Sequence, residues 1–175
     1  MRRILILWTG FGLFIMTTCA QPKGGLYGFS TTISKGLIPT RNIVTNNGTL
    51  SMGMAYMPSD RMCLRAELGF LSQKDTSGTT NSEFTFGMSS WYYLQTSESV
   101  STFLGGTIGF GSETDADGKG TSLLDLEGYF GAEYWFSQRF AWFGHIGLAY
   151  ASYTVAEKKA SDIFTSASTG VSWYF

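Results

Sequence analysis

The chain closes on the stretch Gly170-Val171-Ser172-Trp173-Tyr174-Phe175. In this stretch Val171, Trp173 and Phe175 occupy every second position, with other side chains between them. Alternation with a period of two residues is typical of a β-strand, because successive side chains of a strand point to opposite faces. The stretch therefore predicts a strand with one bulky apolar face, and such a face needs an apolar environment.

The same alternation occurs in eight segments of the sequence. The segments are 25–33, 50–57, 61–73, 81–94, 100–112, 121–137, 140–156 and 162–175. Short breaks at 58–60, 96–99 and 137–139 alternate along the chain with breaks at 34–49, 74–80, 113–120 and 157–161. Alternate connections of an antiparallel sheet lie at opposite ends of the strands. We therefore predict an all-β fold, an eight-stranded antiparallel β-barrel with short turns at one end and longer loops at the other.

Residue parity assigns an apolar face and a polar face to each segment. In segment 121–137, Leu126 and Phe130 share one face, whereas Asp125 and Glu127 share the other. The apolar face continues on neighbouring segments with Met62, Leu64, Ala66, Leu68, Phe70, Phe84, Phe86, Met88, Tyr92, Trp142, Ile146, Leu148 and Tyr150. A soluble ligand-binding barrel of the lipocalin type needs an apolar interior, whereas a membrane-spanning barrel needs an apolar exterior. Because the charged residues suit the lumen, parity predicts a transmembrane β-barrel.

The composition agrees with a single membrane-embedded domain. Charged residues make up 14% of the chain, below the typical quarter, and aromatic residues make up 16%. No uncharged run after residue 16 is long enough for a membrane-spanning helix, so the rest of the chain can enter a membrane only as a closed sheet. The formal net charge is −1, and removal of Arg2 and Arg3 would change it to −1 − 2 = −3. This balance gives no basic patch and no reason to expect nucleic acid as a partner.

The first residues are typical of an export signal. Arg2 and Arg3 precede the uncharged apolar run 4–16, which is shorter than the roughly 20 residues that a spanning helix needs. Thr18 and Ala20 provide small residues for cleavage before Gln21. We predict a signal peptide at 1–20 and a barrel domain at 21–175, which leaves 175 − 20 = 155 mature residues. Lipidation of Cys19 is the alternative, and after cleavage Cys63 would be the one remaining cysteine, without a disulfide partner.

Aromatic residues gather near the predicted turn ends of the strands. Trp and Tyr side chains are favoured at the boundary between lipid and water, where their rings meet both environments. We predict one aromatic girdle formed by Tyr56, Trp91, Trp135, Trp142 and Trp173.

Several segments resemble a known family. The segments 52–61, 105–111 and 131–137 and the final Trp173-Tyr174-Phe175 resemble the small outer-membrane β-barrels of the OmpA transmembrane-domain, OmpX and Ail type, especially porin-family-like barrels of the Bacteroidota. Val171, Trp173 and Phe175 resemble the signal read by the outer-membrane assembly machinery.

The resemblance carries expectations about location and role. It implies a monomer in the cell outer membrane, with lipid and the barrel assembly machinery as partners, both barrel termini in the periplasm and no cofactor. It also implies a non-enzymatic structural or surface-interaction role. An extracellular ligand bound by the loops and a minor gated pore remain open.

The polar face defines a candidate site in the lumen. Its ionisable residues are Arg65, Glu67, Glu83, Asp125, Glu127, Glu133 and His145. An eight-stranded barrel is just wide enough to be filled by side chains, so these charges need partners or water. One interpretation is a static polar plug. The other, implied by the resemblance to OmpA-like barrels, is a gate in which Arg65 exchanges between Glu67 and partners such as Glu133.

Two further chemistries are alternatives. His145 permits a lipid A-modifying enzyme, which needs a nucleophile, a base and an orienting acid within hydrogen-bond reach. Parity directs His145 inward, away from lipid, and we therefore predict no catalytic residues. Glu113, Asp115 and Asp117 have the spacing of a calcium loop, but Leu124 stands where that loop requires a bidentate Glu. We predict a solvated acidic loop without a metal.

Overall fold

The computed structural model describes residues 23–36, 49–74, 80–97, 99–114, 120–155 and 158–175. These residues form eight β-strands: β1 (Tyr27–Gly36), β2 (Thr49–Ser59), β3 (Met62–Lys74), β4 (Thr80–Thr96), β5 (Val100–Thr114), β6 (Gly120–Trp135), β7 (Phe140–Val155) and β8 (Lys158–Tyr174). Within the described ranges, no helix has the length and apolar character needed to cross a lipid bilayer.

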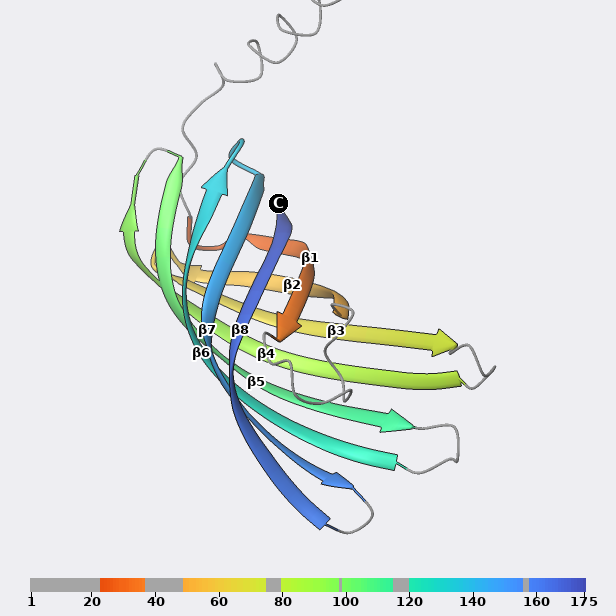
Figure 1. Cartoon of the computed structure of the whole chain (residues 1–175). Coiled ribbons are helices and arrows are strands. Elements are labelled where there is room, and N and C mark those ends of the chain that lie inside the picture. The colour runs from red at the N-terminus through yellow and green to blue at the C-terminus, as the bar shows by residue number, and fades with distance from the viewer. Residues whose placement is uncertain (1–22, 37–48, 75–79, 98, 115–119, 156–157) are drawn as a thin grey trace, which may run out of the picture.

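The strands form one closed antiparallel barrel in sequence order (Figure 1). β1 closes the sheet by pairing with β2 on one side and with β8 on the other, for example through Phe29 opposite Met54 and Trp173. The predicted eight-stranded antiparallel barrel is therefore confirmed. The connections β2–β3, β4–β5 and β6–β7 are short turns closed by local hydrogen bonds. Between β6 and β7, Phe136 N donates to Phe140 O at 2.9 Å.

The β7–β8 hairpin differs from the prediction. We expected a break at 157–161, but β8 already begins at Lys158, which pairs with Val155. The ladder continues through this region, and the Tyr153 hydroxyl donates to Asp162 Oδ2 at 2.7 Å across the hairpin. Residues 158–161 thus belong to a strand, because the ladder and this side-chain bond outweigh their loop-like composition.

The strands extend to different distances at the loop end of the barrel. The last β1–β8 pair joins Gly36 to Ser166, and β8 extends beyond this pair to Lys158. Figure 1 shows the hairpins β3–β4, β5–β6 and β7–β8 reaching beyond the end of β1. Among the described residues, the strands from β3 to β8 therefore extend furthest at the loop end.

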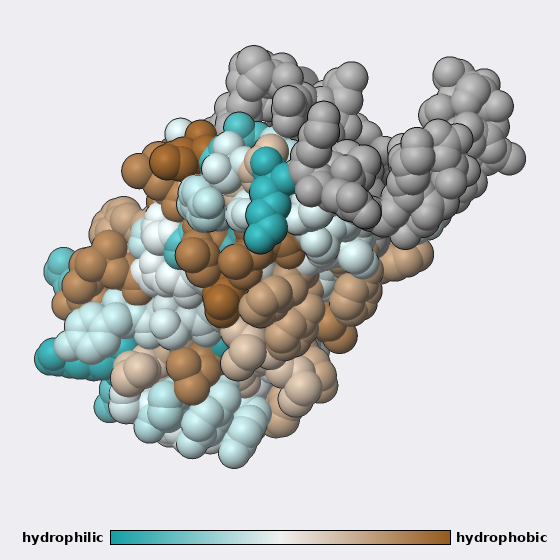
Figure 2. Space-filling model, turned by 90° about the horizontal axis from the view of Figure 1, so that it is seen from below, coloured by the Kyte–Doolittle hydropathy of each residue, from teal (hydrophilic) through white to brown (hydrophobic). Residues whose placement is uncertain are grey.

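Large apolar side chains cover the outside of the barrel. Figure 2 shows apolar side chains spread over the face seen from below. Exposed members from different strands include Phe29, Met52, Phe70, Met88, Leu104, Phe130, Leu148 and Ile163. A soluble monomer rarely exposes so much apolar surface to water. An apolar exterior on every strand is what a lipid environment requires.

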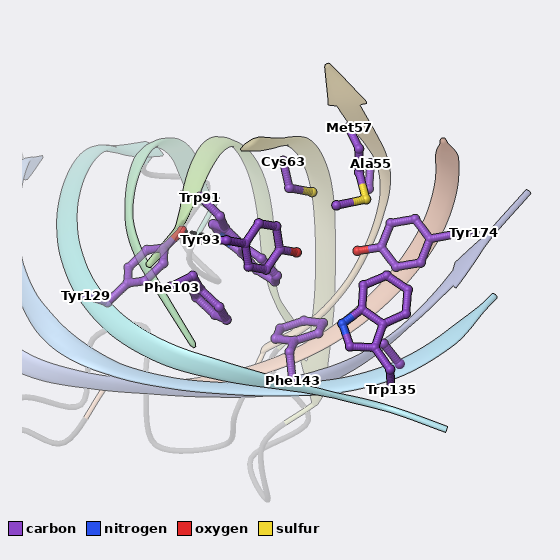
Figure 3. Packing of buried hydrophobic residues seen from close by; sticks show 11 residues of the cluster. Ala55, Met57, Cys63, Trp91, Tyr93, Phe103, Tyr129, Trp135, Phe143 and Tyr174 are labelled. Carbon is purple, nitrogen blue, oxygen red and sulfur yellow. Dashed lines mark hydrogen bonds between the residues drawn. The ribbon is translucent and has the colours of Figure 1, made fainter. Parts of the chain in front are cut away.

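The interior is filled at the turn end by an aromatic cluster (Figure 3). We call this cluster the plug. Its members are Ala55, Met57, Cys63, Trp91, Tyr93, Phe103, Tyr129, Trp135, Ala141, Phe143 and Tyr174. The Trp91 and Phe103 rings stack with centroids 4.1 Å apart, and the Trp135 and Tyr174 rings stack with centroids 5.0 Å apart. The plug thus brings buried side chains from every strand from β2 to β8 together in the interior near the turns.

Candidate functional site

Arg65 on β3 lies at the inner boundary of the plug. Its guanidinium carbon is 4.3 Å from the centroid of the Trp91 ring and 4.2 Å from that of Phe143. A cation between two aromatic faces gains cation–π attraction, and this gain is larger when the cation is removed from water, as the buried Arg65 is. Its Nη2 atom is 3.1 Å from Glu67 Oε1. Arg65 is therefore held by two rings and one carboxylate.

Glu67 connects three strands. Its Oε1 accepts a hydrogen bond from the Thr32 hydroxyl, and its Oε2 accepts one from the Ser51 hydroxyl, both at 3.0 Å. The Glu67 side chain is 22% exposed, whereas the Arg65 side chain is 0% exposed. Glu67 thus lies at the boundary between the buried, turn-side part of the lumen and the solvent-accessible, loop-side part.

Glu133 is fully buried on β6 and has neutral partners. It accepts hydrogen bonds from the Tyr93 hydroxyl at 2.6 Å and from the Tyr174 hydroxyl at 3.1 Å. Among the described residues, the ion pair of Arg65 is with Glu67 and not with Glu133. The structure therefore places Glu133 inside the plug, bonded to tyrosines.

Asp125, Glu127 and His145 lie above the plug, toward the loops. Glu127 accepts a hydrogen bond from the Ser166 hydroxyl, and its Oε1 is 3.7 Å from His145 Nε2. The His145 ring stacks on the Tyr129 ring with centroids 4.0 Å apart. Tyr129 is fixed in turn, because its hydroxyl oxygen accepts a hydrogen bond from Trp91 Nε1 at 2.9 Å. We call Asp125, Glu127 and His145 the polar layer.

The remaining candidate residues are less fully described. Glu83 on β4 lies opposite Leu71 and Glu113 in the strand register, and its side chain is outside the described residues. The Glu113 side chain, Asp115 and Asp117 also lie outside them, as do the predicted signal peptide and Cys19. Among the His, Cys, Asp and Glu residues that are described, no group of three or more could hold a metal ion.

The aromatic girdle requires a correction. Tyr56, Trp142 and Trp173 point outward as predicted, and Trp173 is 62% exposed. The prediction is wrong for Trp91 and Trp135, which are only 2% and 3% exposed and belong to the plug. Both lie near the turn ends of their strands, but both have the parity of the lumen-facing residues on those strands.

The plug itself was missed by the sequence analysis. We expected a polar inner face with charged residues, whereas Tyr93, Phe103 and Phe143 are buried in the turn-side lumen. Residue parity alone was enough to place these three side chains on the lumen face. Tyr93 shares the face of Trp91, and Phe143 shares the face of His145.

The candidate assembly residues Val171, Trp173 and Phe175 all point outward. Phe175 N donates to Tyr27 O at 2.8 Å, and Tyr27 N donates to Phe175 O at 3.2 Å. These bonds join the ends of the described chain where β8 meets β1. The three residues thus lie on the outer face of the strand that closes the barrel.

Comparison with known proteins gives a likeness in structure alone. No protein-family model matches the sequence, and no curated protein matches it. The neisserial surface protein A (NspA) superposes with a TM-score of 0.55 at 12% identity, over 86% of this chain and 95% of that chain. The N-terminal β-barrel domain of OprF from Pseudomonas aeruginosa gives a TM-score of 0.51 at 12% identity, over 87% and 98%. The chain has the fold of the small outer-membrane β-barrels.

In this barrel the lumen has two parts with different chemistry. The turn-side part is aromatic and buried, with Arg65 and Glu133 each held by the surrounding side chains. The loop-side part carries carboxylates that are partly exposed, together with one histidine. The first part is suited to sealing and stabilising the barrel, and the second is suited to contact with small polar solutes.

Proposed function

We propose that this protein is an integral outer-membrane β-barrel with a non-enzymatic structural or surface-interaction role. The observation that carries the proposal is the apolar outer face on all strands of a closed barrel with a filled, polar-and-aromatic lumen. A closed barrel satisfies all backbone hydrogen bonds inside lipid. The fold shared with NspA, by its name a surface protein, supports a place at the cell surface.

The proposed orientation places both barrel termini and the short turns in the periplasm. The connections 37–48, 75–79 and 115–119 then face the exterior together with the two-residue β7–β8 connection, and the first three follow the pattern of longer extracellular loops in outer-membrane barrels. These loops are the proposed contact with an extracellular ligand, and lipid and the assembly machinery are the proposed partners of the outer face. Val171, Trp173 and Phe175 are proposed to present the closing strand to that machinery.

The lumen favours a sealed barrel over a gated pore. A gate based on Arg65 would require its guanidinium to leave Glu67 for another carboxylate. The guanidinium lies between the Trp91 and Phe143 rings, and Glu133 already accepts two tyrosine hydroxyls. We therefore propose that Arg65 has a structural role in the resting protein.

The positions of Ser166 and His145 favour a non-enzymatic role over lipid A modification. Acyl transfer by a serine nucleophile needs a base that accepts the hydroxyl proton. The Ser166 hydroxyl donates to Glu127, but this pair and His145, which stacks on Tyr129, face the lumen and not the lipid that holds the acyl chains. Incubation of the purified barrel with lipopolysaccharide should leave its acyl composition unchanged.

Cell fractionation and gel mobility test the proposed location. The protein should be recovered with outer-membrane lipid, and unheated samples should migrate differently from boiled ones because the closed barrel resists detergent. Recovery in a soluble fraction would contradict the proposal. Protease treatment of intact cells, with a tag inserted directly after the predicted cleavage site before Gln21, tests the orientation, since a periplasmic tag should be protected.

A further inference from the structure

The polar layer combines negative charge with unused hydrogen-bond acceptors. Asp125 and Glu127 lie two residues apart on the inner face of β6. Among the described lumen side chains Arg65 is the one cation, and it pairs with Glu67 below this layer. Asp125 and Glu127 are therefore left without a cationic side chain of their own in the described part of the chain.

His145 is an independent, buried polar group of this layer that lacks a hydrogen-bond partner in the described part of the chain. Its side chain is only 8% exposed, yet neither Nδ1 nor Nε2 has a hydrogen-bond partner among the described residues. The 3.7 Å separation between Nε2 and Glu127 Oε1 is too long for a hydrogen bond. Asp125 Oδ1 is also buried without a hydrogen-bond partner. Buried polar groups in folded proteins are nearly always satisfied by protein, ordered water or a ligand, so these atoms can receive hydrogen bonds from a polar molecule that enters the layer.

We propose that the polar layer binds a small primary ammonium ion that enters from the loop end. An ammonium group carries one positive charge and three N–H donors. These donors match the carboxylates of Asp125 and Glu127 and the acceptor nitrogen of a neutral His145. Charge-assisted hydrogen bonds of this kind are stronger than neutral ones.

A metal ion fits this layer less well than an organic cation. Metal sites need several ligand atoms at bonding distance around one point, and the described residues form no group of three such ligands. An ammonium ion needs only acceptors at hydrogen-bond distance, which a carboxylate and an imidazole supply. The plug closes the turn side, and the partial exposure of Glu67 and Glu127 leaves the loop side as the route of entry.

NMR titration of the folded barrel in detergent micelles tests the proposal directly. His145 is the one histidine of the chain, so its ring signals are identified without ambiguity. n-Butylammonium chloride should shift these signals to saturation. Tetramethylammonium chloride, which has the charge but no N–H donor, and magnesium chloride at equal ionic strength should not. Absence of a saturable shift with butylammonium, or an equal shift with either control salt, would overturn the proposal.

Two charge-matched variants separate a local site from a general negative potential. Glu127→Gln removes the carboxylate charge beside His145 and should weaken butylammonium binding about tenfold, the scale of one charge-assisted hydrogen bond. Asp162→Asn removes a lumen-side charge near the start of β8, where Asp162 accepts a hydrogen bond from the Tyr153 hydroxyl, and should leave the affinity unchanged. Equal weakening by both variants would mean that the whole lumen attracts cations, and would overturn the assignment to the polar layer. Butylammonium binding requires only the folded barrel, so an absence of binding would not contradict the proposed outer-membrane role.

Discussion

At Arg65 the flat shape of the guanidinium matters as well as its charge, because two ring centroids lie 4.3 and 4.2 Å from its central carbon and Nη2 lies 3.1 Å from Glu67 Oε1. An ammonium group cannot stack in this way. Arg65→Lys should therefore lower the free energy of unfolding by about 1–2 kcal/mol, because lysine keeps the charge but loses part of a desolvated cation–π contact that contributes about 2 kcal/mol or more. Urea unfolding in lipid vesicles measures this. Arg61→Lys, an exposed change in the neighbouring turn, is the matched control and should have almost no effect.

The buried position of Glu133 is stabilised by one short hydrogen bond from Tyr93. Tyr93→Phe removes the 2.6 Å donor from a fully buried carboxyl group and should cost about 1–3 kcal/mol of unfolding free energy. The adjacent Tyr92 points outward, and its hydroxyl has a weak 3.5 Å contact with Arg61. Tyr92→Phe should be nearly neutral in the same unfolding assay. Equal effects of the two variants would mean that the hydroxyl of Tyr93 does not stabilise Glu133.

Within β6, the two faces of one strand meet different surroundings. Leu126 points outward between Ile108 and Tyr150 near the middle of the strand. Leu126→Arg should destabilise the inserted barrel by about 2–4 kcal/mol, and Ser122→Arg, on the same face near the loop end, by about 0–1 kcal/mol. Folding equilibria in lipid vesicles measure both. A cost independent of position would contradict the proposed depth of β6 in lipid.

The glycines of β6 test how closely the lumen is packed. A Cβ atom at Gly131 would lie 2.5 Å from Phe103 Cζ and 2.6 Å from Gly144 O, whereas one at Gly128 would meet no atom within 4 Å. Gly131→Ala should destabilise the barrel by about 1–3 kcal/mol through overpacking. Gly128→Ala, on the outer face of the same strand, should be tolerated. Melting of the gel-shifted folded form compares the two, and similar melting temperatures would mean that the plug adapts easily.

The strands and their faces were predictable because both depend on a local pattern. A period of two residues located all eight strands and placed Arg65, Glu127 and Glu133 on the inner face. The girdle prediction failed for Trp91 because it used the position along the strand and ignored parity. The partners of Arg65 could not be predicted in this way, since Trp91 lies on β4 and Phe143 on β7. Their contact depends on the tilt and stagger of the closed sheet, which no local pattern specifies.

For the whole molecule, the plug decides whether the lumen can conduct ions. With the turn side sealed, the wild-type protein in a planar lipid bilayer should show almost no openings. Trp91→Ala removes a ring that stacks on Phe103 and covers Arg65, so it should produce more frequent small-conductance openings. Glu67 and Glu127 would then line the wider part of the path, and reversal potentials in a salt gradient should indicate a preference for cations.

Trp142→Ala is the matched control for this measurement, because Trp142 points outward and bonds to Thr169 through its indole N–H at 2.7 Å. It removes the same amount of aromatic side chain from the lipid-facing surface and leaves the plug complete. Its bilayer traces should match those of the wild type, provided that gel mobility shows both variants to be folded. If the two tryptophan variants conduct equally, the openings arise from a loosened barrel and the plug is not the seal. If only Trp91→Ala conducts, the aromatic cluster at the turn end is the element that keeps this barrel closed.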